Sequence, residues 1–238
     1  MAERRLVVNA DDFGQTRGIN RGIVEAHERG IVTSASLMVR WPAAVEAAAY
    51  ARRRSDLSVG LHVDLGEWVC QAGAWRPLYT VAPLDDAAAV MDEIARQVLR
   101  FRELMGRDPT HLDSHQHVHR REPAQSALAT LANELGVPLR ASDERIRYSG
   151  AFYGQTAEGE PWPEAITVAA LVQTLEALPL GLTELGCHPG YADDGDTMYR
   201  QERAREVAVL CDPRVRQALA RLRIQLTSFA GVVCGAPP

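Results

Sequence analysis

The sequence predicts an α/β protein in which short parallel strands alternate with longer helices. Apolar runs rich in β-forming residues alternate about seven times with stretches whose apolar residues recur at helical spacing. The chain has 238 residues and no segment that reads as an interdomain linker, so we expect a single domain over residues 1–238. That length suits a TIM-like (β/α) barrel, for which ~250 residues are typical, and it also permits a doubly wound open sheet.

Seven short segments are predicted to form the strands: Leu6–Ala10, Thr33–Val39, Ser58–Leu65, Thr110–Asp113, Pro138–Ala141, Thr183–Cys187 and Gln225–Phe229. The predicted helices are Gly18–Glu28, Ala43–Arg54, Asp86–Met105, Pro123–Glu134, Glu164–Ala177, Tyr199–Leu210 and Pro213–Arg223. Glycine follows three of the predicted helix ends, and proline precedes two of the starts. Three long loops remain, Gly66–Asp85, Ser142–Pro163 and Pro189–Met198, and such loops often form lids or substrate walls.

The composition excludes several classes of protein. A net charge of −5 offers no basic surface for nucleic acid or anionic membrane. All 26 basic residues are arginine, so Schiff-base and P-loop chemistry, which need a lysine amine, are excluded. The four cysteines, Cys70, Cys187, Cys211 and Cys234, form no CxxC pair. The first apolar run is too short for a signal peptide or a membrane segment, and we expect a cytoplasmic protein with reduced thiols.

Two adjacent acids, Asp11 and Asp12, follow the first predicted strand. The carboxyl ends of parallel strands are where such folds build their sites. Neighbours in an extended chain point to opposite faces, so one acid can bind a metal while the other accepts a proton. The structural alternative is a turn in which Asp12 caps the next helix.

The segment from His111 to His119, HLDSHQHVH, is the strongest local signal. If it is extended, its odd-numbered positions share one face, which carries four imidazoles and Asp113. That composition suits a metal site in which a carboxylate holds the second nitrogen of a ligand histidine. A catalytic zinc keeps three protein ligands, so the four histidines cannot all bind one ion. The alternative is a solvated polar loop.

Three further residues are candidates. His62 shares a strand face with Asp64 while the opposite face is apolar, which favours a barrel-mouth site over a hydrogen-bonded core histidine. His188 precedes Pro189 and either acts as a general acid or closes a turn. Arg140, at a predicted strand end, can orient a carboxylate, bind substrate or lie on the surface.

These motifs together resemble the YdjC/ChbG family of metal-dependent carbohydrate deacetylases, which are similar in mechanism to the NodB-type polysaccharide deacetylases. The resemblance rests on NADDFG from Asn9, GLH from Gly60, HLDSHQHVH from His111 and CHPG from Cys187, which occur in the family's order. The stretch from Phe152 to Ile166 also looks like a subgroup found with hopanoid biosynthesis. The resemblance implies a distorted (β/α) barrel, often a homodimer, that acts on an acetylated sugar or a glycolipid.

The resemblance also implies one divalent ion, zinc or magnesium, held by Asp12, His62 and His115. It makes Asp11 the general base and His188 the acid or a substrate contact. The metal would polarise the amide carbonyl and lower the pKa of bound water toward ~7, Asp11 would take a proton, and His188 would protonate the leaving amine. Two imidazoles and one carboxylate suit zinc better than magnesium, which prefers oxygen ligands.

Substrate binding is expected to involve Arg140, His117 and Asp113. Asp64 departs from the neutral residue more usual in the family, and we expect it to affect the polarity of the substrate pocket. The loops 66–85 and 142–163, with Trp68, Trp75 and Trp162, are expected to define the substrate, since indoles stack on sugars as well as on a barrel rim. Three alternatives stay open: another metal hydrolase, a non-haem iron enzyme with the same ligands, and a non-catalytic sugar-binding or metal-storage module.

Overall fold

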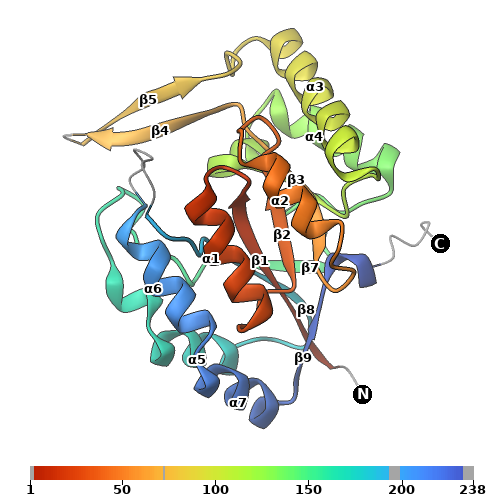
Figure 1. The fold of residues 1–238 in the computed structure, drawn as a ribbon. Coiled ribbons are helices and arrows are strands. Elements are labelled where there is room, and N and C mark those ends of the chain that lie inside the picture. The colour runs from red at the N-terminus through yellow and green to blue at the C-terminus, as the bar shows by residue number, and fades with distance from the viewer. Residues whose placement is uncertain (1–2, 72, 193–198, 233–238) are drawn as a thin grey trace.

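The computed structural model describes residues 3–71, 73–192 and 199–232 (Figure 1). Its centre is a seven-stranded parallel sheet made of β1 (Arg4–Phe13), β2 (Ser34–Leu37), β3 (Ser58–Val63), β6 (Leu112–Ser114), β7 (Ile146–Ser149), β8 (Gly181–Cys187) and β9 (Ile224–Thr227). The strand order is β6-β3-β2-β1-β8-β7, and β9 pairs with the first half of β1. The end strands β6 and β7 do not pair within the described ranges, so the sheet is a curled half-barrel. This confirms the predicted distorted barrel of about seven parallel strands.

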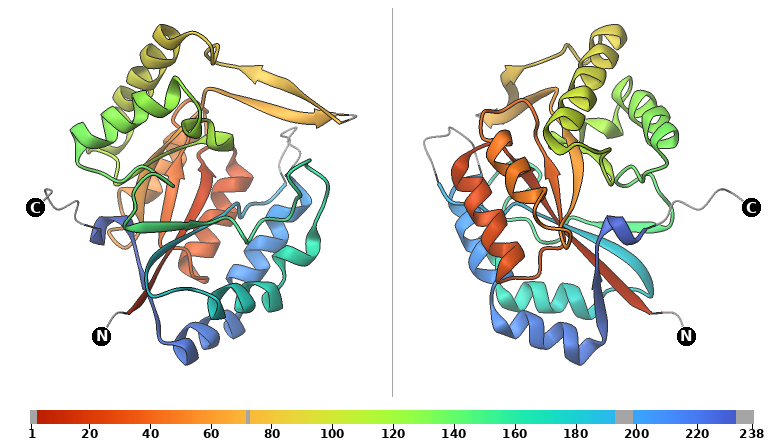
Figure 2. Two further views of the ribbon diagram at one scale, coloured as in Figure 1. Left: turned by 180° about the vertical axis from the view of Figure 1, so that it is seen from behind. Right: turned by 45° about the vertical axis from the view of Figure 1, so that its right-hand side comes forward.

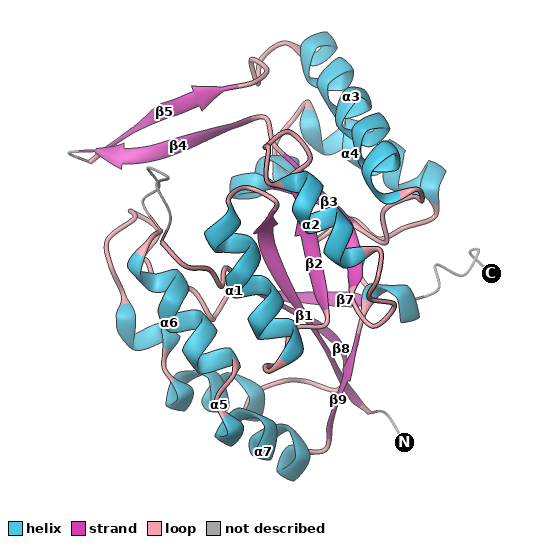
Figure 3. Cartoon of the chain, viewed as in Figure 1, coloured by secondary structure: helices cyan, strands magenta, loops and turns pink. Residues whose placement is uncertain are grey.

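The described part of the chain contains seven α-helices, which are seen around the sheet in Figure 3. They are α1 (Arg17–Glu28), α2 (Ala44–Ala51), α3 (Ala87–Met105), α4 (Ala124–Leu135), α5 (Val168–Glu176), α6 (Gln201–Leu210) and α7 (Pro213–Leu222). Side-chain caps fix the starts of α1, α3, α5 and α7, because the first turn of a helix leaves backbone N–H groups unpaired. Thr16 caps α1 by accepting from the Ile19 N–H, and Asp86 caps α3 in the same way. None of these helices is both long and apolar enough to cross a membrane.

The core of the sheet is apolar and tightly buried. Leu6, Val8 and Ala10 of β1 are fully buried, and so are Val59 and Leu61 of β3. Burying each such large aliphatic side chain contributes about 1.5–3 kcal/mol. The carboxyl ends of the strands therefore stand on a rigid base.

Three sequence predictions about strands are wrong. Pro138–Ala141 is not a strand: it makes one isolated bridge, between Leu139 and Leu112, and Ala141 has a left-handed φ of 59°. The segment turns there because the Arg140 side chain is drawn into a buried ionic cluster described below. The seventh strand is instead β7, which lies inside the predicted loop Ser142–Pro163.

The predicted loop Gly66–Asp85 contains an antiparallel hairpin of β4 (Gly66–Gln71) and β5 (Ala74–Thr80). Figure 2 shows it extending from the body of the molecule. Its residues lack a regular apolar period because β5 is exposed along nearly its whole length. In the third predicted loop, Pro189–Met198, residues 193–198 lie outside the described part of the chain. Cys234 also lies outside it, and the described cysteines form no disulfide.

Candidate metal centre and active site

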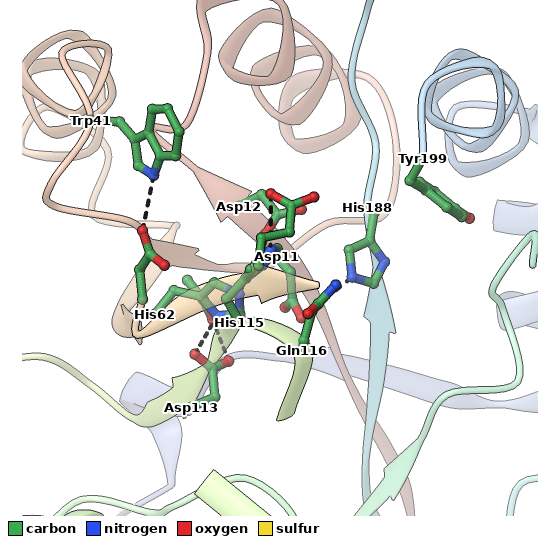
Figure 4. Close-up of polar contacts among 12 residues, drawn as sticks. Asp11, Asp12, Trp41, His62, Asp113, His115, Gln116, His188 and Tyr199 are labelled. Atoms are coloured by element: carbon green, nitrogen blue, oxygen red, sulfur yellow. Dashed lines mark hydrogen bonds and ion pairs between the residues drawn. The ribbon is translucent and has the colours of Figure 1, made fainter. Parts of the chain in front are cut away.

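The ends of four strands bring together the residues that the sequence singled out. Asp11 and Asp12 come from β1, His62 from β3, His115 from the turn after β6, and His188 from the residue after β8 (Figure 4). All five line one cavity of about 870 Å³. Residues as far apart in the chain as Asp11 and His188 thus meet at one mouth, as expected for the carboxyl ends of parallel strands.

The two acids do not follow strand alternation. The pairing of β1 with β2 shifts in register between Ala10 and Phe13, and Asp12 adopts a left-handed φ of 65°. Such an irregularity re-aims side chains, and here both carboxylates reach the same cavity rather than opposite faces. The cap of α1 is Thr16, so the alternative role of Asp12 as a helix cap does not occur.

Asp12, His62 and His115 form a compact group of potential ligands. Asp12 Oδ1 lies 3.0 Å from His115 Nδ1 and 3.4 Å from His62 Nε2, and the three ligand atoms lie within 4.8 Å of one another. The other ring nitrogen of His62, Nδ1, lies 2.7 Å from Asp113 Oδ1. A carboxylate behind a ligand histidine is a common feature of metal sites. The donor set of two imidazoles and one carboxylate fits a divalent ion such as zinc.

The electrostatics of this group favour positive charge between its carboxylates. Burial alone would lower the pKa values of both histidines. The facing carboxylates more than reverse this, Asp113 raising the pKa of His62 to about 9 and Asp12 raising that of His115 to about 10. The protons on the two imidazolium rings thus balance the negative charge of Asp12 and Asp113, and a bound metal ion would take over this role. His115 Nε2 is also buried without a hydrogen bond.

Asp11, His62 and Asp113 form a second acidic group, but it already holds a cation. The side chain of Arg140 is fully buried, and its two terminal nitrogens each lie 2.6 Å from an Asp11 oxygen. It also lies 2.8 Å from Asp113 and 2.7 Å from Glu184. Burial would raise the pKa of Asp11, but Arg140 holds it below its usual value. Neither Arg140 nor Asp113 lines the cavity, and their ionic contacts are with other buried residues of the site.

Arg203 of α6 was not singled out by the sequence and lies at the centre of the site. Its Nη2 lies 2.6 Å from Asp12 Oδ2, and its Nη1 donates to the His188 carbonyl at 3.3 Å. Burial would raise the pKa of Asp12, but Arg203 and then His115 hold it well below its usual value. No local pattern marks Arg203, because it sits in an ordinary helical segment and its partners are distant in sequence.

His188 forms the opposite side of the site. Its Nε2 lies 3.7 Å from Asp11 Oδ2, and its ring lies against Tyr153 and Tyr199 at centroid distances of 5.2 and 5.5 Å. The His188 backbone N–H donates to Glu206 at 2.5 Å. Burial lowers the pKa of His188 to about 4, so its imidazole is neutral near pH 7.

The prediction that odd positions from 111 to 119 share one face is wrong. The strand ends at Ser114, and Gln116 and His117 have left-handed φ values of 49° and 54°. His117 reaches the cavity, with Nε2 3.3 Å from the Tyr148 hydroxyl. His119 Nδ1 lies 2.7 Å from Ser114 Oγ, so His119 stabilises the turn.

His111 lies beneath the site rather than in it. It stacks on Phe229 at a centroid distance of 4.0 Å, and its Nε2 lies 3.0 Å from Ser36 Oγ. Gly60 makes room for it, since a Cβ there would lie 2.5 Å from the ring. Burial lowers the pKa of His111 to about 4, as suits a neutral core residue.

The cavity wall is aromatic. It includes Trp68 and Trp75 of the hairpin and Phe152 and Tyr153 of the segment before α5. Two expected contributors do not line it. Trp162 is 51% exposed on another surface, and Asp64 is fully buried at the base of the hairpin, so neither sets the polarity of the cavity.

A curled parallel half-barrel with a His/His/Asp group and a neighbouring acid at its mouth defines a candidate metal-hydrolase architecture. The family model described as YdjC-like protein matches residues 5–221, and the chain belongs to this family. The assignment made from the NADDFG, GLH, HLDSHQHVH and CHPG motifs is thereby confirmed at the level of the family.

Individual relatives agree with this placement. The chain is 33% identical over 259 residues to a chitooligosaccharide deacetylase of Klebsiella pneumoniae (strain 342), covering 97% of this chain and 100% of the relative. It is similar to the structure of a proposed cellobiose-phosphate cleavage protein of Enterococcus faecalis V583, with a TM-score of 0.77, 25% identity, and coverage of 98% and 100%. A family 4 carbohydrate esterase from Streptomyces lividans in complex with acetate shares the fold, with a TM-score of 0.55, 16% identity, and full coverage of both chains (100% each).

Proposed function

We propose that this protein is a metal-dependent carbohydrate deacetylase that hydrolyses the acetamide of an N-acetylated amino sugar or glycoconjugate. The observation that carries the proposal is the buried Asp12, His62 and His115 group with Asp11 beside it on the same cavity. The relative from Klebsiella pneumoniae, which the chain matches over nearly its whole length, is named a chitooligosaccharide deacetylase. The cavity of about 870 Å³ with aromatic walls has the size and character for a sugar.

Asp12, His62 and His115 would hold the ion, which when bound supplies Lewis-acid polarisation of the acetyl carbonyl and an acidified water. The donor set favours zinc over magnesium. Asp113 fixes the His62 ring through Nδ1, and Arg203 fixes Asp12 through the oxygen that does not face the histidines. The ligands are thus held before the ion arrives, which lowers the cost of binding it.

Asp11 is the proposed general base. Its pKa lies below the usual value and its carboxylate faces the cavity, so it is ionised and available at neutral pH. The bidentate contact with Arg140 sets its orientation. His188, 3.7 Å from Asp11, is neutral at rest, so it must gain its proton during turnover. In this proposal the proton that Asp11 removes from water passes to His188 and then to the leaving amine, which leaves both side chains as they began.

The identity of the acetylated substrate is a more specific part of the proposal. The relative's name supports a chitooligosaccharide, whereas the stretch from Phe152 to Ile166 resembles the hopanoid-associated subgroup. The hopanoid link and the homodimer implied by the resemblance stay predictions.

The test is acetate release after the protein is stripped with a chelator and reloaded. The substrates are N,N′-diacetylchitobiose and an N-acetylated amino-sugar glycolipid, with zinc or magnesium added back separately. We expect no acetate from the stripped protein and restored release after reloading with one of the two metals. Release that survives complete metal removal, or a reloaded protein that releases no acetate from either substrate, would contradict the proposal.

A further inference from the structure

The β4–β5 hairpin carries a buried acid that the proposed chemistry does not use. Glu67 is 7% exposed, lines the cavity, and places Oε2 at 3.7 Å from His115 Nε2. That nitrogen has no hydrogen-bond partner, while the other ring nitrogen faces Asp12. His115 therefore lies between two carboxylates, that of Asp12 on β1 and that of Glu67 on the hairpin.

Each of the two proposed histidine ligands has a carboxylate beside its second ring nitrogen, at hydrogen-bond distance for His62 (2.7 Å) and at ion-pair distance for His115 (3.7 Å). His62 has Asp113 behind its Nδ1, and His115 has Glu67 behind its Nε2. A carboxylate at the second nitrogen orients a ligand imidazole and increases its basicity. The two carboxylates also come from different parts of the fold: Asp113 belongs to the central sheet, whereas Glu67 belongs to the β4–β5 hairpin.

A two-stranded hairpin is marginally stable by itself, so something must hold Glu67 in place. The Gln116 side chain makes two reciprocal hydrogen bonds with the Trp68 backbone: it accepts from the Trp68 N–H at 2.9 Å and donates to the Trp68 carbonyl at 2.7 Å. Trp68 is paired opposite Pro77, which has no N–H to offer, and the register of the hairpin shifts between Glu67 and Trp68. Gln116 therefore satisfies backbone groups that the hairpin leaves unpaired.

The left-handed conformation of Gln116 adds to this argument. A left-handed φ in a residue other than glycine costs about 1–3 kcal/mol and persists only where its surroundings require it. Here it directs the amide of Gln116 toward β4, immediately after the proposed ligand His115. Two adjacent residues on the turn, 115 and 116, thus meet two adjacent residues on the hairpin, 67 and 68. Figure 4 shows Gln116 beside His115 in the site.

We propose that Glu67 is a positioning residue for His115 and that Gln116 holds the β4–β5 hairpin where Glu67 can act. This inference rests on the proposed metal site and assigns a structural link to it. The hairpin that walls the substrate cavity also orients a ligand of the ion, so wall and metal centre form one unit. Asp64 completes the attachment by accepting from the Gly66 N–H and the Tyr79 hydroxyl, both at 3.1 Å.

The test measures zinc affinity by competition with a chromogenic chelator in the full-length protein, which needs no substrate. Glu67→Ala is expected to weaken zinc binding about 10–100-fold, the usual range for removing such a partner. Glu67→Gln keeps a hydrogen-bond acceptor and should recover part of that loss. Gln116→Ala removes the two side-chain hydrogen bonds to the Trp68 backbone, and it should also weaken zinc binding and speed hydrogen exchange of the β4 amides.

Arg76→Ala is the matched control, since Arg76 is an exposed hairpin residue that does not line the cavity. It should leave zinc affinity unchanged. If wild-type protein binds zinc while Glu67→Ala and Gln116→Ala bind it equally well, the positioning role is wrong and the proposed function stands. If wild-type protein binds no divalent ion, the proposed metal site fails and this inference fails with it.

Discussion

The floor of the cavity and its hairpin wall are built in opposite ways. On the floor, Asp11, Asp12 and His62 are at most 3% exposed and stand on the ends of central strands. In the wall, β5 is mostly exposed, and Trp75 is 53% exposed. The floor depends on the folded core, whereas the hairpin depends on a few attachments to it. The floor is therefore held by the folded core, and the hairpin is held by attachments such as those made by Gln116 and Asp64.

The energetic cost of disturbing each region should differ accordingly. On the floor every buried charge has a close partner, as Asp11 has in Arg140 and Asp12 has in Arg203. Removing one member of such a pair leaves an uncompensated buried charge and typically costs 3–5 kcal/mol. Most of β5 is exposed, so we expect the hairpin to open locally more readily than the floor. Substitutions that remove a buried charge on the floor should thus lower stability more than substitutions of exposed residues in the hairpin.

The largest effect is expected on removing a proposed ligand. His62→Ala should lose the ion and bring acetate release below detection, because the site keeps only two donors. Elemental analysis of the dialysed protein measures the metal content directly. His27→Ala, on α1, is the matched control and should keep both metal and activity. A His62→Ala protein with full metal content would remove His62 from the site.

Asp11→Asn should separate chemistry from metal binding. The amide keeps the shape of the side chain but cannot take a proton, so kcat should fall about 10²–10⁴-fold while the ion is retained. Metal content and kcat are measured on the same preparation, and thermal melting checks that neutralising one of the three carboxylates around Arg140 has not unfolded the floor. Unchanged turnover would exclude Asp11 as the base.

Metal affinity should rise with pH. The pKa values of His62 and His115 are raised to about 9 and about 10 without metal, so at pH 7 both rings carry protons that the ion must displace. Affinity should therefore increase about tenfold per pH unit for each proton displaced, and it should fall as the pH is lowered. Zinc competition titrations at pH 6.5, 7.5 and 8.5 measure the slope. An affinity independent of pH over this range would contradict a site built on these two histidines.

The smallest effect is expected in the wall. Trp75→Ala should raise KM about 2–10-fold with little change in kcat, since stacking on an aromatic ring contributes about 0.5–1.5 kcal/mol. Trp162→Ala provides a control of equal size and similar exposure, 51% against 53%, outside the cavity. Equal KM values for the two variants would mean that the hairpin indole does not contact substrate.

The same contrast explains what the sequence could predict. The floor residues lie in short motifs at strand ends, so the alternation of strands and helices predicted that these motifs meet at one mouth. The family resemblance then implied Asp12, His62 and His115 as the ligands. The β1 irregularity that turns both acids into the cavity has no signature in the letters Asp11-Asp12, because adjacent residues in a regular strand point apart. Arg203 and Glu67 escaped notice because their roles exist only through contacts with residues far away in the sequence.

Secondary-structure prediction failed where the tertiary contacts of a side chain override the local propensity of the backbone. Pro138–Ala141 has the composition of a strand, yet Arg140 is buried among three carboxylates and the backbone turns at Ala141. The β4–β5 hairpin was not predicted because its exposed strand β5 has no buried face, so its apolar residues do not alternate with a period of two.

The most direct test of the account is to locate the ion by anomalous X-ray scattering at the zinc edge in crystals of the zinc-loaded protein. We predict a single strong peak bounded by Asp12 Oδ1, His62 Nε2 and the His115 ring, with Arg140 still bound to Asp11 and Asp113. A peak among Asp11, His62 and Asp113 with Arg140 displaced, or no peak within reach of Asp12, would contradict it.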